Sequence, residues 1–244
     1  MQMENSSSTE KHNVLWHNQL VRALQLIFLS LSVLSFFSAI VMSYREGRAN
    51  SKWMFSLEDV LFLLLFLSAA VLLFCMVASL LSKRNILAAT LMFLVSFILF
   101  VGYFINHQRV YLLGFRNYAK NILTVEEWMT ISRCAQTNMK PRDSLWVAEN
   151  TADSLWNSDR NAEVGSEQKL WSEFTNQTQI QKLEPYEIIS VPAPGRTEIE
   201  WGSAIVGHRG IIIYSNSNDI SPPDDVWLGP SFFAPDMAAF LENN

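Results

Sequence analysis

The residues best suited to catalytic chemistry lie around one histidine in the last quarter of the chain. His208 lies in the segment Gly207-His208-Arg209-Gly210, whose two glycines leave access for a ligand. A general base needs an accessible proton acceptor and a second group that orients it. The nearby carboxylates that suit this orienting role are Glu198, Glu200 and Asp219. His208 is therefore a candidate catalytic residue, although a glycine-flanked hairpin turn that happens to contain a polar residue is the simpler interpretation.

The second half of the chain also contains candidate binding residues. Asp224 and Asp225 follow two prolines and are candidates for a cation or peptide contact, against the simpler interpretation of an exposed acidic turn. Trp201 is a candidate partner- or ligand-binding residue beside His208. Two interpretations exist for Trp128, Trp171 and Trp201: they line a ligand pocket, or they pack in a core. Their helical and strand spacing favours the core.

Motifs for other kinds of chemistry are missing from the sequence. It has no G-x-S-x-G motif, no phosphate-binding loop and no H-E-x-x-H metal motif, and its four histidines are scattered. Cys75 lies in an apolar stretch and Cys134 in a polar half of the chain, so a disulfide between them is not expected. We expect no metal site and no cofactor, and a protein without enzymatic activity is favoured over an enzyme.

Three windows without Lys, Arg, Asp or Glu dominate the first half of the chain. They run over residues 23–44, 60–82 and 85–108, and the third span is expected to end near residue 106. A hydrocarbon core of about 30 Å needs about 20 helical residues, so each window is long enough to cross it. A chain of 244 residues has no core large enough to bury three such helices. The windows therefore predict three transmembrane helices and an integral membrane protein.

The flanks of these windows agree with that assignment. Ser56, Glu58 and Asp59 suit the start of the second helix, where a hydroxyl and carboxylates cap free N–H groups. Serines in the first window and the Cys75–Ser79 pair in the second are suited to close helix contact, although each serine can equally bond back to its own helix. No ionisable side chain lies inside any window, which argues against a transport path through them. A pore lined by serine stays open as an alternative.

Charge is divided unevenly along the chain. Residues 121–244 contain 8 basic and 18 acidic side chains, whereas residues 1–120 contain 10 basic and 5 acidic ones. An acidic second half lacks the basic surface that phosphate backbones require, so nucleic acid is not an expected partner. Around the spans, six basic residues on the side of the second half face four on the other. The protein is expected in the cell membrane. The positive-inside rule then favours a cytoplasmic second half, with a difference of two basic residues between the sides.

The second half reads as a small soluble α+β domain over residues 124–244, joined by an interfacial helix or linker over 109–123 that could also continue the third helix. Capping-box spacing between Thr124 and Glu127 predicts a helix over 125–136, and an apolar stripe predicts a second over 166–177. A polar stretch over 149–165 is expected to be a loop.

Strand-like patterns follow these two helices. They cover 187–191, 197–206 and 210–214, with an antiparallel hairpin turning at 207–210. Residues 221–225 are expected to form a turn, and 236–241 a helical turn capped by Asp236.

The predicted architecture is thus a tail over 1–22, a membrane α-helical region over 23–108 and a small α+β domain with an antiparallel hairpin. The preferred function is a membrane-anchored binding or assembly module that contacts a protein partner or a second copy through its C-terminal domain. The alternatives are a membrane-tethered enzyme with His208 as general base, and an accessory subunit of a pore or transporter.

Overall fold

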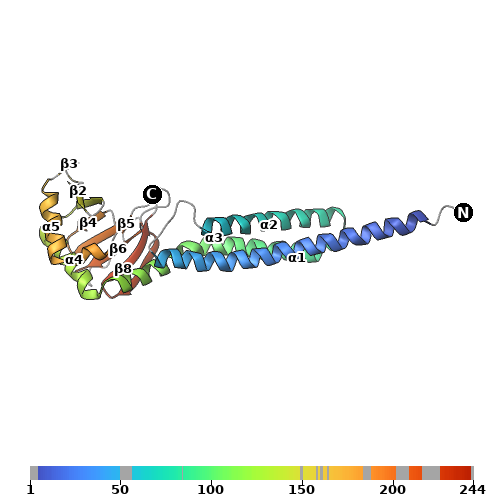
Figure 1. The fold of residues 1–244 in the computed structure, drawn as a ribbon, viewed down its shortest axis with the longest axis horizontal. Coiled ribbons are helices and arrows are strands. Elements are labelled where there is room, and N and C mark those ends of the chain that lie inside the picture. Colours follow the sequence, from blue (N-terminus) through green and yellow to red (C-terminus); the bar gives the residue numbers. More distant parts are fainter. Residues whose placement is uncertain are drawn as a thin grey trace. The chain divides into compact units, whose positions relative to one another are not determined.

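The computed structural model describes residues 5–49, 57–83, 85–148, 151–157, 159, 162–163, 165–183, 188–201, 209–215 and 226–242 (Figure 1). The chain divides into two compact units, the first within residues 1–43 and 53–108, the second within 44–52 and 109–244. The ends of two long helices belong to the second unit, because the boundaries fall at residues 43/44 and 108/109.

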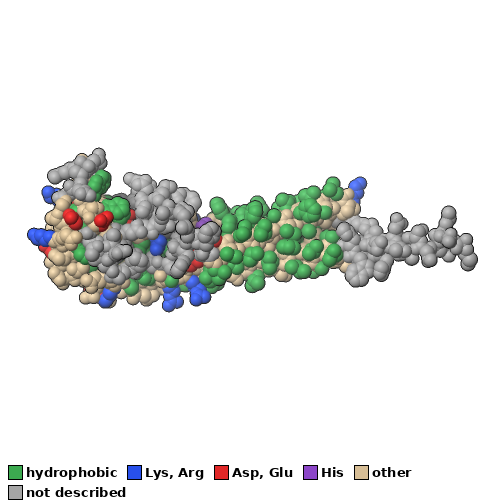
Figure 2. All heavy atoms as spheres, turned by 45° about the horizontal axis from the view of Figure 1, so that its top comes forward, with side chains coloured by type: hydrophobic (Ala, Val, Ile, Leu, Met, Phe, Trp, Pro, Cys, Tyr) green, Lys and Arg blue, Asp and Glu red, His purple; other side chains and the backbone are tan. Residues whose placement is uncertain are grey.

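Three long helices account for the apolar half of the chain. They are α1 (Asn5–Arg48), α2 (Leu57–Leu81) and α3 (Ile86–Ile122). Each contains a segment long and apolar enough to cross a bilayer, which confirms the three predicted helical windows. Their outward side chains are hydrophobic: Phe74 is 74% exposed and Leu87 75% (Figure 2). A surface of this kind is stable in lipid and costly in water.

Polar contacts fix the register of the helices in the first unit. Ser32 Oγ and Ser96 Oγ are 2.7 Å apart, and Ser43 Oγ donates to the His107 carbonyl at 2.8 Å, both pairs 64 residues apart in the chain. The constant offset shows that α1 and α3 run parallel. Ser32 also donates a hydrogen bond to the Phe28 carbonyl at 3.0 Å. This one serine therefore both bonds back to its own helix and contacts a neighbouring helix.

The second unit begins with a tight crossing of the ends of α1 and α3. A Cβ atom on Gly47 would overlap the Tyr111 carbonyl oxygen, and one on Gly114 would overlap the Tyr44 carbonyl oxygen. Asn117 Nδ2 donates to Tyr44 Oη across the same crossing at 3.1 Å. The two glycines therefore allow backbone-to-backbone contact that any side chain would prevent.

Two further helices of this unit match their predictions. α4 (Val125–Asn138) has the predicted capping box, with Thr124 as N-cap and Glu127 as its partner. α5 (Glu167–Gln177) buries the predicted stripe of Leu170, Trp171 and Phe174, and a 3₁₀ helix follows at Ile180–Leu183.

An antiparallel sheet forms the rest of the second unit. Its strands are β1 (Asp143–Ala148), β2 (Thr151–Asn157), β3 (Ala162–Glu163), β4 (Ile188–Ala193), β5 (Arg196–Trp201), β6 (Arg209–Tyr214), β7 (Val226–Ala234) and β8 (Met237–Glu242). Among the described residues their order is β3-β2-β1-β4-β5-β6-β8-β7. The antiparallel pairing of β5 with β6 confirms the predicted hairpin.

One face of the sheet packs against helices. Leu145, Ile189, Ile199, Ile211 and Ile213 are all fully buried on this first face. They form one hydrophobic core with residues of α4, α5 and the end of α3, including Phe115 and Trp128. The end of α3 therefore belongs to the core of the α+β domain.

Two predictions for the second half were wrong, and two strands were missed. Residues 149–165 were expected to be a loop, but β2 and β3 lie there, because pairing with β1 gives a polar segment hydrogen-bonded partners that its composition does not reveal. Asp236 was expected to cap a helical turn, but Met237–Glu242 is a strand between β6 and β7. β1 and β7 were not predicted.

The predicted turn at 207–210 was also wrong in part. Arg209 and Gly210 already belong to β6, opposite Trp201 and Glu200. Gly210 is required for another reason, since a Cβ there would overlap the ring of Phe240 on the neighbouring strand. Residues 202–206, expected to extend β5, and the turn at 221–225 lie outside the described residues.

Candidate functional site

The predicted site around His208 falls mostly outside the described residues. His208, Asp219, Asp224 and Asp225 all do so, and their grouping remains a prediction. Trp201, Glu198 and Glu200 are described, on β5. Alternation along the strand places Trp201 on the first face of the sheet and the two glutamates on the second, so these three side chains do not converge.

Trp201 is a core residue. It is 1% exposed, its Nε1 donates to the Leu183 carbonyl at 3.2 Å, and its ring meets that of Phe115 edge-on at 5.4 Å. Trp128 is likewise fully buried and donates to the Ala119 carbonyl at 3.1 Å. Both indole N–H groups are thus satisfied inside the protein, which is how a structural tryptophan is recognised.

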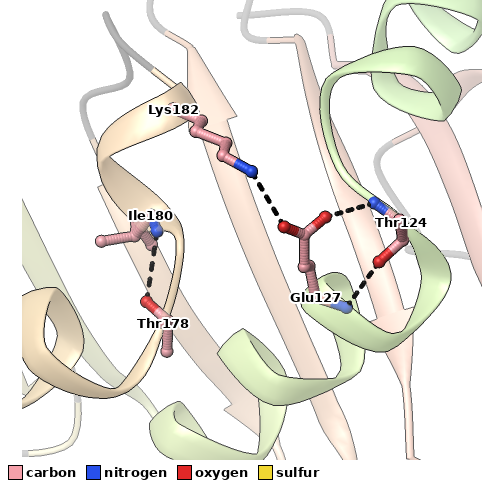
Figure 3. A network of polar contacts seen from close by, with 5 residues as sticks. All are labelled: Thr124, Glu127, Thr178, Ile180 and Lys182. Atoms are coloured by element: carbon pink, nitrogen blue, oxygen red, sulfur yellow. Dashed lines mark hydrogen bonds and ion pairs between the residues drawn. The ribbon is translucent and has the colours of Figure 1, made fainter.

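The capping box of α4 is linked to the helix that follows α5 (Figure 3). Glu127 accepts a hydrogen bond from the Thr124 N–H at 2.7 Å, and Thr124 Oγ1 accepts one from the Glu127 N–H at 3.2 Å. Lys182 Nζ lies 2.9 Å from the Glu127 carboxylate. The backbone hydrogen bond from Thr124, followed by the one from Lys182, lowers the pKa of Glu127. This network is structural, because each polar group in it faces another.

A polar cluster lies on the second face of the sheet. The Arg196 guanidinium pairs with the Glu198 carboxylate two residues along the same strand, with Nε at 2.8 Å. Tyr214 is the cross-strand partner of Arg196 and is 1% exposed. Burial raises the pKa of Tyr214, with opposing smaller effects from Arg196 and Glu198. The carboxylate is therefore committed to an ion pair, and the phenol stays neutral over the physiological range.

Aromatic side chains extend this second face on both sides of the cluster. Strand register places Trp146 opposite Ile188, and Ile188 opposite Glu200. It also places Phe232 opposite Ala238, which lies opposite Ile212. Ile212, Tyr214 and Phe240 form a small buried cluster here, whereas Trp146 is 42% exposed and Phe232 39%. Trp146 thus lies two strands and Phe232 three strands from the Arg196–Glu198 pair, on opposite sides of it. Exposed aromatics are frequent in protein-binding surfaces.

Further polar groups lie near the start of α2 and the start of α5. Glu58, expected to cap α2, is buried and accepts a hydrogen bond from Tyr103 of α3, whose ring stacks on His107 at 5.3 Å. Ser166 and Lys169 have the S-x-x-K spacing of some acyl-transfer enzymes, although this spacing was expected to be absent from the second half of the chain. Both are exposed, and within the described residues no hydrogen bond joins them.

The described side chains do not assemble a metal site. Within the described ranges, no three His, Cys, Asp or Glu side chains lie close enough together to hold one ion. The geometry on the second face therefore suits recognition better than bond-making, since its polar atoms are paired and its most exposed members are aromatic.

Comparison with known proteins gives no relative for this arrangement. The chain matches no protein-family model, and neither curated proteins nor solved structures show a significant similarity to it.

Proposed function

We propose that this chain is a multi-pass integral membrane protein whose C-terminal α+β domain binds a protein partner. The three apolar helices would fix the domain at the cell membrane, and the excess of basic residues on its side of the spans favours the cytoplasm. The observation that supports binding most directly is the second face of the sheet, where Trp146 and Phe232 are exposed. Trp146 lies two strands, and Phe232 three strands, from the strand of the Arg196–Glu198 pair. A second copy of the chain is the alternative occupant of this face.

Membrane insertion is tested first. Membranes that contain the full chain are washed with alkaline carbonate, and the pellet and supernatant are compared. A spanning protein stays in the pellet because removing its apolar helices from lipid exposes them to water. Recovery in the supernatant, monodisperse without detergent, would disprove the anchor.

Partner binding is tested by crosslinking in membranes followed by affinity purification in mild detergent. We expect Trp146→Ala and Phe232→Ala each to weaken recovery of the crosslinked species by tenfold or more, because exposed aromatics at interfaces commonly contribute about 2 kcal/mol. Val125→Ala is the matched control, since Val125 is also an exposed apolar residue of the domain at 48% but lies on α4. A crosslinked species of twice the chain mass would identify a second copy. A lone monomer in every sample would contradict the proposal.

A further inference from the structure

The end of α1 and the last turns of α3 present basic side chains. Arg45 and Arg48 are exposed in the last turn of α1. On α3, Arg109 and Lys120 are exposed and Arg116 is partly exposed. All five residues belong to the second unit, whose remaining sequence is strongly acidic.

The basic residues of α3 lie on one face of the helix. The spacing of 109, 113, 116 and 120 places these residues on a single stripe, with the exposed Leu113 between the charges. The opposite stripe of Tyr111, Leu112, Phe115 and Ala119 is buried in the domain core. Core packing therefore fixes which way the basic face points, and it leaves the charged groups in solvent.

Arg45 lies within about 9 Å of the level of Arg109 along the two helices. At the crossing Gly47 contacts Tyr111 and Gly114 contacts Tyr44, which are offsets of 64 and 70 residues. These offsets place Arg45 level with a point between residues 109 and 115 of α3. Arg109 is also the first charged residue after the third apolar window. At 1.5 Å per residue, Arg116 lies about 10 Å and Lys120 about 16 Å beyond it along the helix axis. Arg45 and Arg109 thus lie nearest to the end of the apolar segments, and Arg48 follows about one helical turn after Arg45.

These cations have no acidic partner in the described structure. Neither 44–49 nor 109–122 contains an exposed acid, since Glu46 is 9% exposed. The ion pairs formed among described residues involve other basic groups, namely Arg142, Lys182 and Arg196. An exposed group of arginines without carboxylates matches a phosphodiester, which accepts two hydrogen bonds from one guanidinium.

We infer that Arg45, Arg48 and Arg109 form a site for the headgroups of anionic phospholipids, with Arg116 and Lys120 as weaker outer contacts. The inference rests on the proposed membrane insertion, because the site lies where the apolar segments end and headgroups begin. The weaker outer role follows from distance, since attraction to a charged bilayer falls off within a Debye length of about 8–10 Å.

The test uses the full chain in lipid nanodiscs of phosphatidylcholine mixed with phosphatidylglycerol. After transfer to mild detergent, native mass spectrometry measures how much of each lipid stays bound. We expect the wild-type chain to retain phosphatidylglycerol preferentially, and Arg45→Gln/Arg109→Gln to lower that preference about 25-fold. This is about fivefold per arginine, the equivalent of ~1 kcal/mol each. Arg116→Gln/Lys120→Gln should lower it less.

The control is Lys140→Gln/Lys169→Gln, which removes the same charge from two exposed lysines elsewhere in the domain. An equal loss in this control, or no preference in the wild type, would overturn the inference. Retention of glycerol 3-phosphate by the detergent-solubilised chain as strong as that of the lipid would also overturn it, because the ligand would then be a soluble phosphate. If the arginine variant does not fold, the wild-type chain alone tests the inference. Its preference for phosphatidylglycerol must fall as salt is added, because salt screens the attraction between charges. Incorporation into nanodiscs without lipid preference would leave the anchor intact and remove only the headgroup site.

Discussion

Glu127 links the start of α4 to the segment after α5 through Thr124 and Lys182. Its pKa in the folded chain is lowered, chiefly by the hydrogen bond from the Thr124 N–H. A lowered folded-state pKa stabilises the fold above the ordinary glutamate pKa of about 4.3, and the stabilisation is lost as pH falls through the folded-state value. We expect Glu127→Gln to flatten the decline in unfolding midpoint between neutral and acidic pH, measured by circular dichroism in detergent.

Glu126→Gln is the control for this prediction, because Glu126 is exposed in the same helical turn and its side chain has no part in the capping box. If both variants give the same pH profile, the capping contacts do not set the pH dependence.

The Thr124–Glu127 half of the network was predictable, since capping boxes are local in sequence. Lys182 was not, because only the packing of the 3₁₀ helix near α4 brings it 2.9 Å from the carboxylate.

At the scale of elements, the crossing of α1 and α3 depends on two glycines. We expect Gly47→Ala or Gly114→Ala to lower the free energy of unfolding by about 1–3 kcal/mol, because each new methyl group would force the backbones apart. Gly102→Ala is the matched control. Its Cβ would lie 3.9 Å from Phe36 Cε2, an ordinary contact, and alanine raises helix propensity by about 1 kcal/mol. Equal unfolding midpoints for all three variants in a denaturant titration would contradict a tight crossing.

Helices were predictable from sequence far better than strands. The three apolar windows and the stripe of Leu170, Trp171 and Phe174 are long, strongly patterned signals, and each became a helix. β2 and β8 were missed because a strand is stabilised by neighbours far away in the chain. Met237–Glu242 has two alanines and a leucine, which suit a helix, yet pairing on both sides with β6 and β7 overrides that preference. The arrangement of Trp146 and Phe232 on one face follows from that register and could not be predicted.

At the scale of the whole molecule, α3 has residues in both units, and its end is part of the core of the α+β domain. Phe115 is fully buried, and its ring contacts those of Trp201 and Tyr118. Leu113, two residues earlier, is 48% exposed on the opposite stripe. The same helix therefore offers a core position and a surface position that differ in burial but not in helical context.

We expect Phe115→Ala to destabilise the domain by about 3–5 kcal/mol, the usual cost of removing a buried phenylalanine ring. Leu113→Ala should cost far less, because its side chain loses little burial. Urea unfolding of the full chain in detergent, followed by tryptophan fluorescence, measures both effects, and the loss of Phe115 should also shift the native emission of Trp201 to the red. If the two variants unfold at the same urea concentration, the end of α3 is only a tether to the domain. If Phe115→Ala alone unfolds early, the helix that leaves the apolar segment also completes the domain core.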